Sequence, residues 1–66
     1  MITVFETWDQ LMKQVGTLSE EDLRESINYE VSTYKRKNVI SRMHQRYVKL
    51  KAKRERQLLI DGEMLL

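Results

Sequence analysis

The fold of this chain is decided by residues 18–50, which read LSEEDLRESINYEVSTYKRKNVISRMHQRYVKL. The stretch opens on a helix start, because Ser19 is a favoured N-cap residue and the acids at 20–22 lie at the positive end of the helix dipole. Apolar side chains then recur every three or four residues, at Leu23, Ile27, Val31 and Tyr34. This spacing places them on one helical face and predicts a helix over residues 20–35.

A second apolar series predicts a helix over about residues 39–60, ended by Gly62. Its members are Ile40, Met43, Tyr47 and Leu50. At 100° per residue the two series lie on nearly opposite sides of a common helix, and the change of side falls at residues 35–38. Either the chain turns there, with Asn38 capping a third helix, or one helix of about 40 residues changes its buried face midway. We favour the turn. We also prefer a helix to a strand for the alternating residues 27–33, because a lone strand has nothing to pair with.

A shorter helix is predicted over residues 8–15. Thr7 and Gln10 form a capping box at its start, and Gly16 stands where a helix end takes a left-handed residue. We therefore predict an all-α fold and a single domain (1–66), in which the short N-terminal helix packs on a helical hairpin or on one long helix that dimerises. The predicted core consists of Trp8, Leu11, Met12, Val15, Leu18, Leu23, Ile27, Val31, Tyr34, Ile40, Met43, Tyr47, Leu50 and Leu58.

The composition is that of a small globular protein. The 66 residues are 41% hydrophobic and 33% charged, and none is a cysteine, which excludes disulfides, thiol nucleophiles and cysteine-based metal sites. No secretory leader is evident, and no apolar run approaches the ~20 residues of a transmembrane helix, so we expect a cytoplasmic protein without a membrane partner. A core this small is marginal, and burial in a homo-oligomer or against a partner would add to its stability.

The sequence contains few side chains in a pattern typical of a catalytic site. His44 is the only histidine, and its helical neighbours are basic, so they would repel a metal cation. The serines have no histidine at a suggestive spacing, and no glycine-rich phosphate loop is present. The sequence therefore predicts a protein that is not an enzyme, with no catalytic residue, no metal site and no cofactor.

The informative feature is a basic stripe on the last predicted helix. Its members, spaced by three or four residues, are Arg42, Arg46, Lys49, Lys53 and Arg56. On a helix these cations form one line that could contact either a protein partner or a nucleic-acid backbone. Three structural interpretations compete: the cations flank a coiled-coil seam, their stems cover apolar surface, or a helical hairpin neutralises them with the acids of residues 20–25. Secondary contact candidates are Tyr29, Lys35, Met64, Leu65 and Leu66.

Charge is strongly segregated along the chain. Residues 1–34 carry a net charge of −5, residues 35–56 carry +9 and residues 57–66 carry −2. The leading prediction is a small helical interaction protein that binds and modulates a protein partner, of the accessory or inhibitor type. The alternative is nucleic-acid binding by the basic stripe of residues 42–56, largely independent of base sequence. It ranks second because the acidic half would repel a polyanion.

Overall fold

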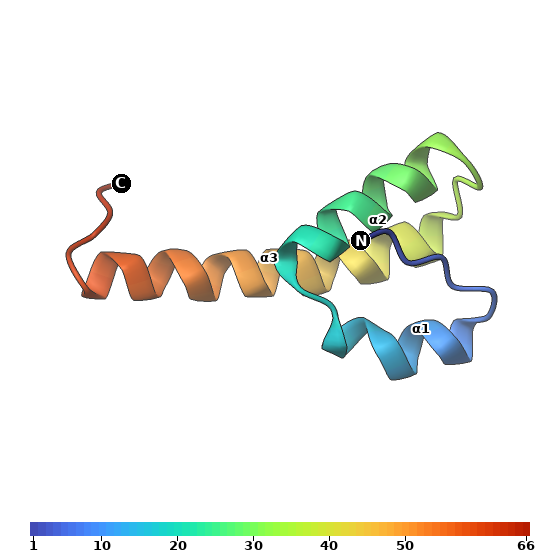
Figure 1. Cartoon of the computed structure of the whole chain (residues 1–66), viewed down its shortest axis with the longest axis horizontal. Coiled ribbons are helices and arrows are strands. Elements are labelled where there is room, and N and C mark those ends of the chain that lie inside the picture. The colour runs from blue at the N-terminus through green and yellow to red at the C-terminus, as the bar shows by residue number, and fades with distance from the viewer.

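Three α-helices and one short 3-10 helix make up the fold. The computed structural model describes all of residues 1–66: α1 is Trp8–Gln14, the 3-10 helix η1 is Val15–Thr17, α2 is Glu20–Ser32 and α3 is Lys37–Ile60, with no strand (Figure 1). The predicted all-α class is confirmed. The predicted turn is also confirmed, because α2 and α3 are separate helices that pack side by side, and this excludes both the single long helix and the strand at residues 27–33.

The predicted starts of the first two helices are confirmed by their capping hydrogen bonds. The Thr7 hydroxyl accepts a bond from the Gln10 backbone N–H at 3.2 Å, and the Ser19 hydroxyl accepts one from the Asp22 N–H at 3.1 Å. The Gln10 side-chain oxygen accepts from the Glu6 backbone N–H at 3.0 Å, one residue earlier than a capping box requires. These bonds satisfy donors that a helix start leaves unpaired.

The helix ends differ from the prediction at three places. Gly16 is not a left-handed helix end: α1 stops at Gln14, and the chain tightens into η1. α2 ends at Ser32, three residues early, and α3 begins at Lys37, two residues early, with Arg36 rather than Asn38 as its N-cap. Gly62 does end α3 as predicted. Its φ of 74° lets its N–H reach the Leu59 carbonyl while the Glu63 N–H reaches the Leu58 carbonyl.

The turn between α2 and α3 is held by an ion pair between the buried Glu30 and the half-buried Arg36. The Glu30 carboxylate, 3% exposed, accepts two bonds from the Arg36 guanidinium, at 3.0 Å from Nε and 2.7 Å from Nη2. Arg36 Nη1 also donates to the Phe5 carbonyl at 2.8 Å. Lys35, which precedes Arg36 in this turn, has a left-handed φ of 55°, and its N–H donates to the Glu30 carbonyl. One arginine thus connects α2, the turn and the N-terminal segment.

The core is smaller than predicted and includes residues that the periodicity does not mark. Its buried apolar members are Phe5, Leu11, Val15, Leu23, Val39 and Met43, and Leu18, Ile27, Tyr47 and Leu50 pack against them. Four predicted core residues are instead exposed, namely Trp8, Met12, Val31 and Tyr34, while Ile40 and Leu58 are half-buried. Phe5 is part of the core because the N-terminal segment lies along α2. There the Thr3 N–H donates to the buried Ser26 hydroxyl at 2.8 Å.

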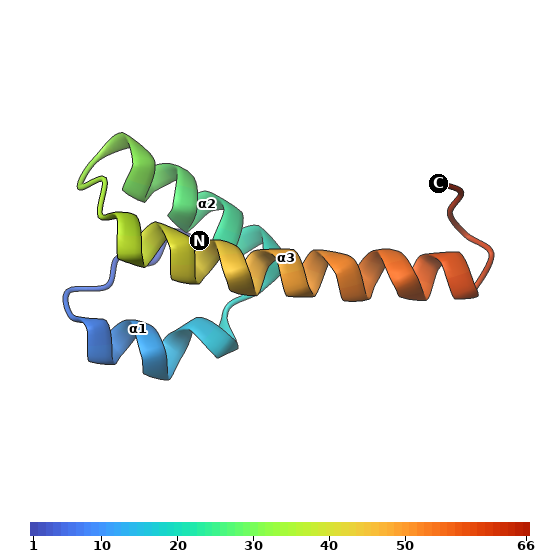
Figure 2. The same cartoon turned by 180° about the vertical axis from the view of Figure 1, so that it is seen from behind.

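α3 is longer than the elements that cover it. Its second half projects beyond α1 and α2, as both views show (Figures 1 and 2). The molecule measures 41 × 23 × 19 Å, and its radius of gyration of 13.4 Å exceeds the about 11 Å of a compact chain of this length. We call residues 51–60 the projecting end of α3. None of the helices combines the length and the apolar character needed to cross a lipid bilayer.

Candidate functional site

Most of the basic stripe is free of acidic partners. Lys49, Lys53 and Arg56 are exposed on α3, Arg42 is half-buried, and none of the four forms an ion pair. α3 also carries Glu55, which is two residues, or about 160° around the helix, from Lys53 and one residue, about 100°, from Arg56. The line from Arg42 to Arg56 therefore extends over roughly 20 Å of helix without an acid on it.

Arg46, the fifth member of the stripe, has a structural role instead. Its Nη2 donates to the Gly16 carbonyl in η1 at 3.3 Å, and its buried Nε has no hydrogen-bond partner. This side chain thus connects α3 to the end of α1 and is not available as a freely exposed cation. Sequence spacing places Arg46 on the stripe correctly, but only the tertiary fold brings the Gly16 carbonyl to it.

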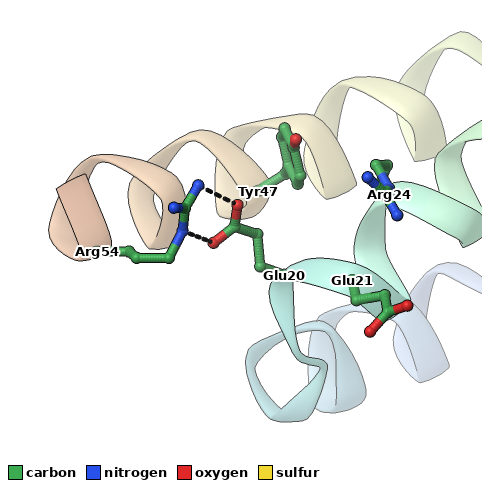
Figure 3. A pocket seen from close by; sticks show the side chains of 5 residues that line it. All are labelled: Glu20, Glu21, Arg24, Tyr47 and Arg54. Atoms are coloured by element: carbon green, nitrogen blue, oxygen red, sulfur yellow. Dashed lines mark hydrogen bonds and ion pairs between the residues drawn. The ribbon is translucent and has the colours of Figure 1, made fainter. Parts of the chain in front are cut away.

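A single ion pair joins the acidic start of α2 to α3. Glu20 accepts two bonds from Arg54, at 2.9 Å from Nε and 3.0 Å from Nη2 (Figure 3). The Arg54 guanidinium lowers the pKa of Glu20, and the carboxylate raises the pKa of Arg54. One of the three structural interpretations of the stripe is partial neutralisation by the acids of residues 20–25 in a helical hairpin. The one α2–α3 ion pair uses Arg54, which lies about 100° to 160° around α3 from the exposed lysines and Arg56 of the stripe.

This ion pair borders a polar cleft of about 420 Å³ between α2 and α3. The cleft is lined by Glu20, Glu21, Arg24, Tyr47 and Arg54. In Figure 3, Glu20 and Arg54 meet at one side, while the Arg24 and Glu21 side chains lie apart and make no drawn contact. Two of the four charged side chains of the cleft thereby hold α2 against α3.

The other acids of α2 are partly compensated by the N-terminal amine. The Met1 amine lies 2.7 Å from Asp22 Oδ1 and 2.7 Å from Glu25 Oε2. These hydrogen bonds raise the pKa of the amine from 8.0 to about 10 and lower that of Asp22. With Glu30 paired to Arg36, four of the five acids of α2 have cationic partners within the chain.

A groove between α1 and α3 lies at the Arg42 end of the stripe. It has a volume of about 320 Å³ and is lined by Trp8, Asn38, Ser41, Arg42 and Gln45. The four α3 residues are spaced three, one and three apart, so they share one side of that helix, and Trp8 faces them from α1. The sequence interpretation did not find this groove because the helical periodicity assigns Trp8 to the core.

His44 lies in a different cleft, with Arg24, Ile27, Asn28 and Tyr47. Its ring stacks on that of Tyr47, with centroids 6.3 Å apart and planes at 29°. No group of three His, Asp or Glu side chains is close enough to hold a metal ion together.

The secondary contact candidates do not gather with the stripe. Lys35 is in the turn between α2 and α3, at the opposite end of the molecule from the projecting end of α3 (Figure 1). It is therefore not in line with the stripe, as a continuous helix would have made it. Tyr29 is half-buried on α2, and Met64 is half-buried beyond α3, followed by the exposed Leu65 and Leu66.

Comparison of the chain with protein-family models, curated proteins and solved structures finds no match in any of the three.

Proposed function

We propose that this chain is a non-enzymatic nucleic-acid-binding protein that contacts phosphates with the free cations of the basic stripe. The observation that supports this proposal is the unpaired state of Arg42, Lys49, Lys53 and Arg56 along one side of α3. Four cations spread over roughly 20 Å can neutralise phosphates of one strand and release their counterions, which favours binding without base sequence being read.

The pairing of acids within the chain weakens the main objection to a polyanionic partner, and leaves Glu6, Asp9 and Glu21 as the unpaired acids of residues 1–34. The sequence suggests that the acidic half would repel nucleic acid. In the fold, Glu20 is paired with Arg54 on another side of α3, Glu30 is paired with Arg36, and Asp22 and Glu25 hold the Met1 amine. Paired charges produce a weaker field at a distance than free ones, so the stripe can attract phosphates. The proposal retains the cytoplasmic location that the sequence predicts.

A comparison of two triple variants tests whether the stripe is the contact surface. The stripe variant is Lys49→Gln/Lys53→Gln/Arg56→Gln, and the control is Lys13→Gln/Lys37→Gln/Lys51→Gln, which replaces exposed cations elsewhere. Both lower the net charge from +2 to −1. Fluorescence anisotropy of a labelled oligonucleotide should show affinity reduced roughly tenfold or more by the stripe variant and by less than about threefold by the control. Equal losses would show that net charge, and not this surface, determines binding.

Exposed apolar side chains favour a second candidate function, binding of a protein partner in the accessory or inhibitor manner. Leu59 and Ile60 on the projecting end of α3 are 37% and 72% exposed, and Leu65 and Leu66 are fully exposed. A partner could cover them while acids on it meet the neighbouring lysines.

A pull-down with and without nuclease separates the two functions. If the chain binds a protein, the partner should still be recovered after nuclease treatment, and Leu59→Ser/Ile60→Ser should no longer recover it. The control Ile2→Ser, at an exposed residue of the N-terminal segment, should still recover it. Recovery that nuclease abolishes supports the nucleic-acid proposal.

A further inference from the structure

The groove at the Arg42 end of the stripe combines an aromatic wall with a polar rim. Trp8 is 46% exposed, although Leu11 in α1 and Val15 in η1 are almost fully buried. Across the groove, Asn38 and Gln45 each offer an amide donor and acceptor, Ser41 offers a hydroxyl, and Arg42 adds a cation. No acidic side chain lines the groove.

These groups match the parts of one nucleotide. An indole face can stack on a base of any identity, amide and hydroxyl groups can bond to the edge of a base, and a guanidinium can contact the adjoining phosphate. Arg42 belongs both to the groove and to the stripe, so a strand entering the groove would continue along Lys49, Lys53 and Arg56. A base can enter such a site only when it is not paired and stacked inside a duplex.

We infer that the groove binds an unpaired base of a single-stranded nucleic acid, with the base stacked on Trp8 and the following phosphates on the stripe. This inference rests on the proposed nucleic-acid function and adds to it a preference for single strands over duplexes. Charge complementarity and the position of the groove at the end of the stripe favour this occupant over an apolar peptide, which would leave the amides and Arg42 without partners.

The single tryptophan makes the inference directly measurable. Trp8 is the only tryptophan in the chain, so its fluorescence reports on this groove alone. The probes are a labelled oligothymidylate of about ten nucleotides, within the usual range of single-strand site sizes, and a labelled duplex of the same length. Anisotropy of the label measures binding, and Trp8 emission measures stacking.

We expect the single strand to quench Trp8 emission and the duplex to bind through the stripe without comparable quenching. Trp8→Leu should weaken single-strand binding about tenfold and leave duplex binding within about twofold, while Trp8→Tyr, which retains an aromatic face, should restore most of the affinity. Circular dichroism checks that both variants remain helical, and the measurement on the unmodified chain holds even if one variant does not fold.

Two results separate this inference from the proposed function. Strand binding seen by anisotropy without any change in Trp8 emission would overturn the groove as a base site and leave the stripe as the contact surface. An absence of anisotropy change with both probes would overturn the proposed function and this inference with it.

Discussion

Lys35 holds a backbone conformation that only glycine adopts without cost. Its φ is 55°, in the left-handed region, where a Cβ crowds the following carbonyl. We predict that Lys35→Gly stabilises the fold by about 0.5–1 kcal/mol, since relief of this strain exceeds the entropy that glycine adds to the unfolded chain. Urea unfolding measures the change. The control Lys35→Ala keeps the strain and should bring no gain, so a gain for alanine equal to that for glycine would refute the explanation.

The Glu30–Arg36 pair is the polar interaction on which the turn depends most. Replacing Arg36 with Met would leave a carboxylate that is 3% exposed without its guanidinium, and would also remove the bond to the Phe5 carbonyl. We predict a loss of stability on the order of 2–3 kcal/mol in urea unfolding. Arg24→Met, at an exposed α2 position without an ion pair, should change stability by less than about 0.5 kcal/mol. Similar losses in the two variants would contradict this role.

The same pair predicts how acid affects stability. The hydrogen bonds from Arg36 lower the pKa of Glu30 below its ordinary value of 4.5. The folded state therefore favours the carboxylate, and this contribution is complete above pH 4.5 and is lost as the pH falls through the lowered pKa. Urea unfolding at a series of pH values should show that Arg36→Met loses less stability below pH 4.5 than the unmodified chain. Parallel profiles would show that other carboxylates, such as Glu20 and Asp22, account for the acid sensitivity.

At the scale of elements, the two halves of α3 differ in how much of the fold packs against them. Residues 39–50 pack against the core, whereas the projecting end contributes no residue to the core and is joined to α2 by the Arg54–Glu20 ion pair. An isolated helical segment of this length is marginal in water, so its backbone bonds should open often. Amide hydrogen exchange should be much faster in residues 51–60 than in residues 39–50, and bound nucleic acid should slow it. Equal protection along the free α3 would contradict this division.

Helix starts are predictable from the sequence because their causes are local. Thr7 and Ser19 accept bonds from residues three positions on, so the residue types alone identify them. Core membership depends on tertiary contacts instead. Phe5 has no helical periodicity and is buried only because the N-terminal segment lies along α2, while Trp8 and Val31 have the right periodicity and remain exposed. The basic stripe could be found from spacing, but the groove and the role of Arg46 depend on where α1 and η1 pack.

At the scale of the whole molecule, the fold uses within one chain the apolar face of α3 that self-association would need. In the series Ile40, Met43, Tyr47 and Leu50, Met43 is buried within the chain, and Tyr47 and Leu50 pack against its core, so this face is not free to pair with a second copy. Pairing two projecting ends would also bring their lysines and arginines together. We therefore expect sedimentation at micromolar concentration to give an 8.0 kDa monomer. A dimer would show that the exposed residues of α3 provide a seam of their own.

The salt dependence of strand binding tests the central claim most directly. A labelled single-stranded oligonucleotide is titrated with the protein at several salt concentrations, and the logarithm of the association constant is plotted against that of salt. Four stripe cations on phosphates predict a slope of about −2.8, and Lys49→Gln/Lys53→Gln/Arg56→Gln should reduce its magnitude to about 0.7. The claim is contradicted if tens of micromolar protein bind no strand at low salt, where weak phosphate contacts are strongest, or if the variant keeps the full slope.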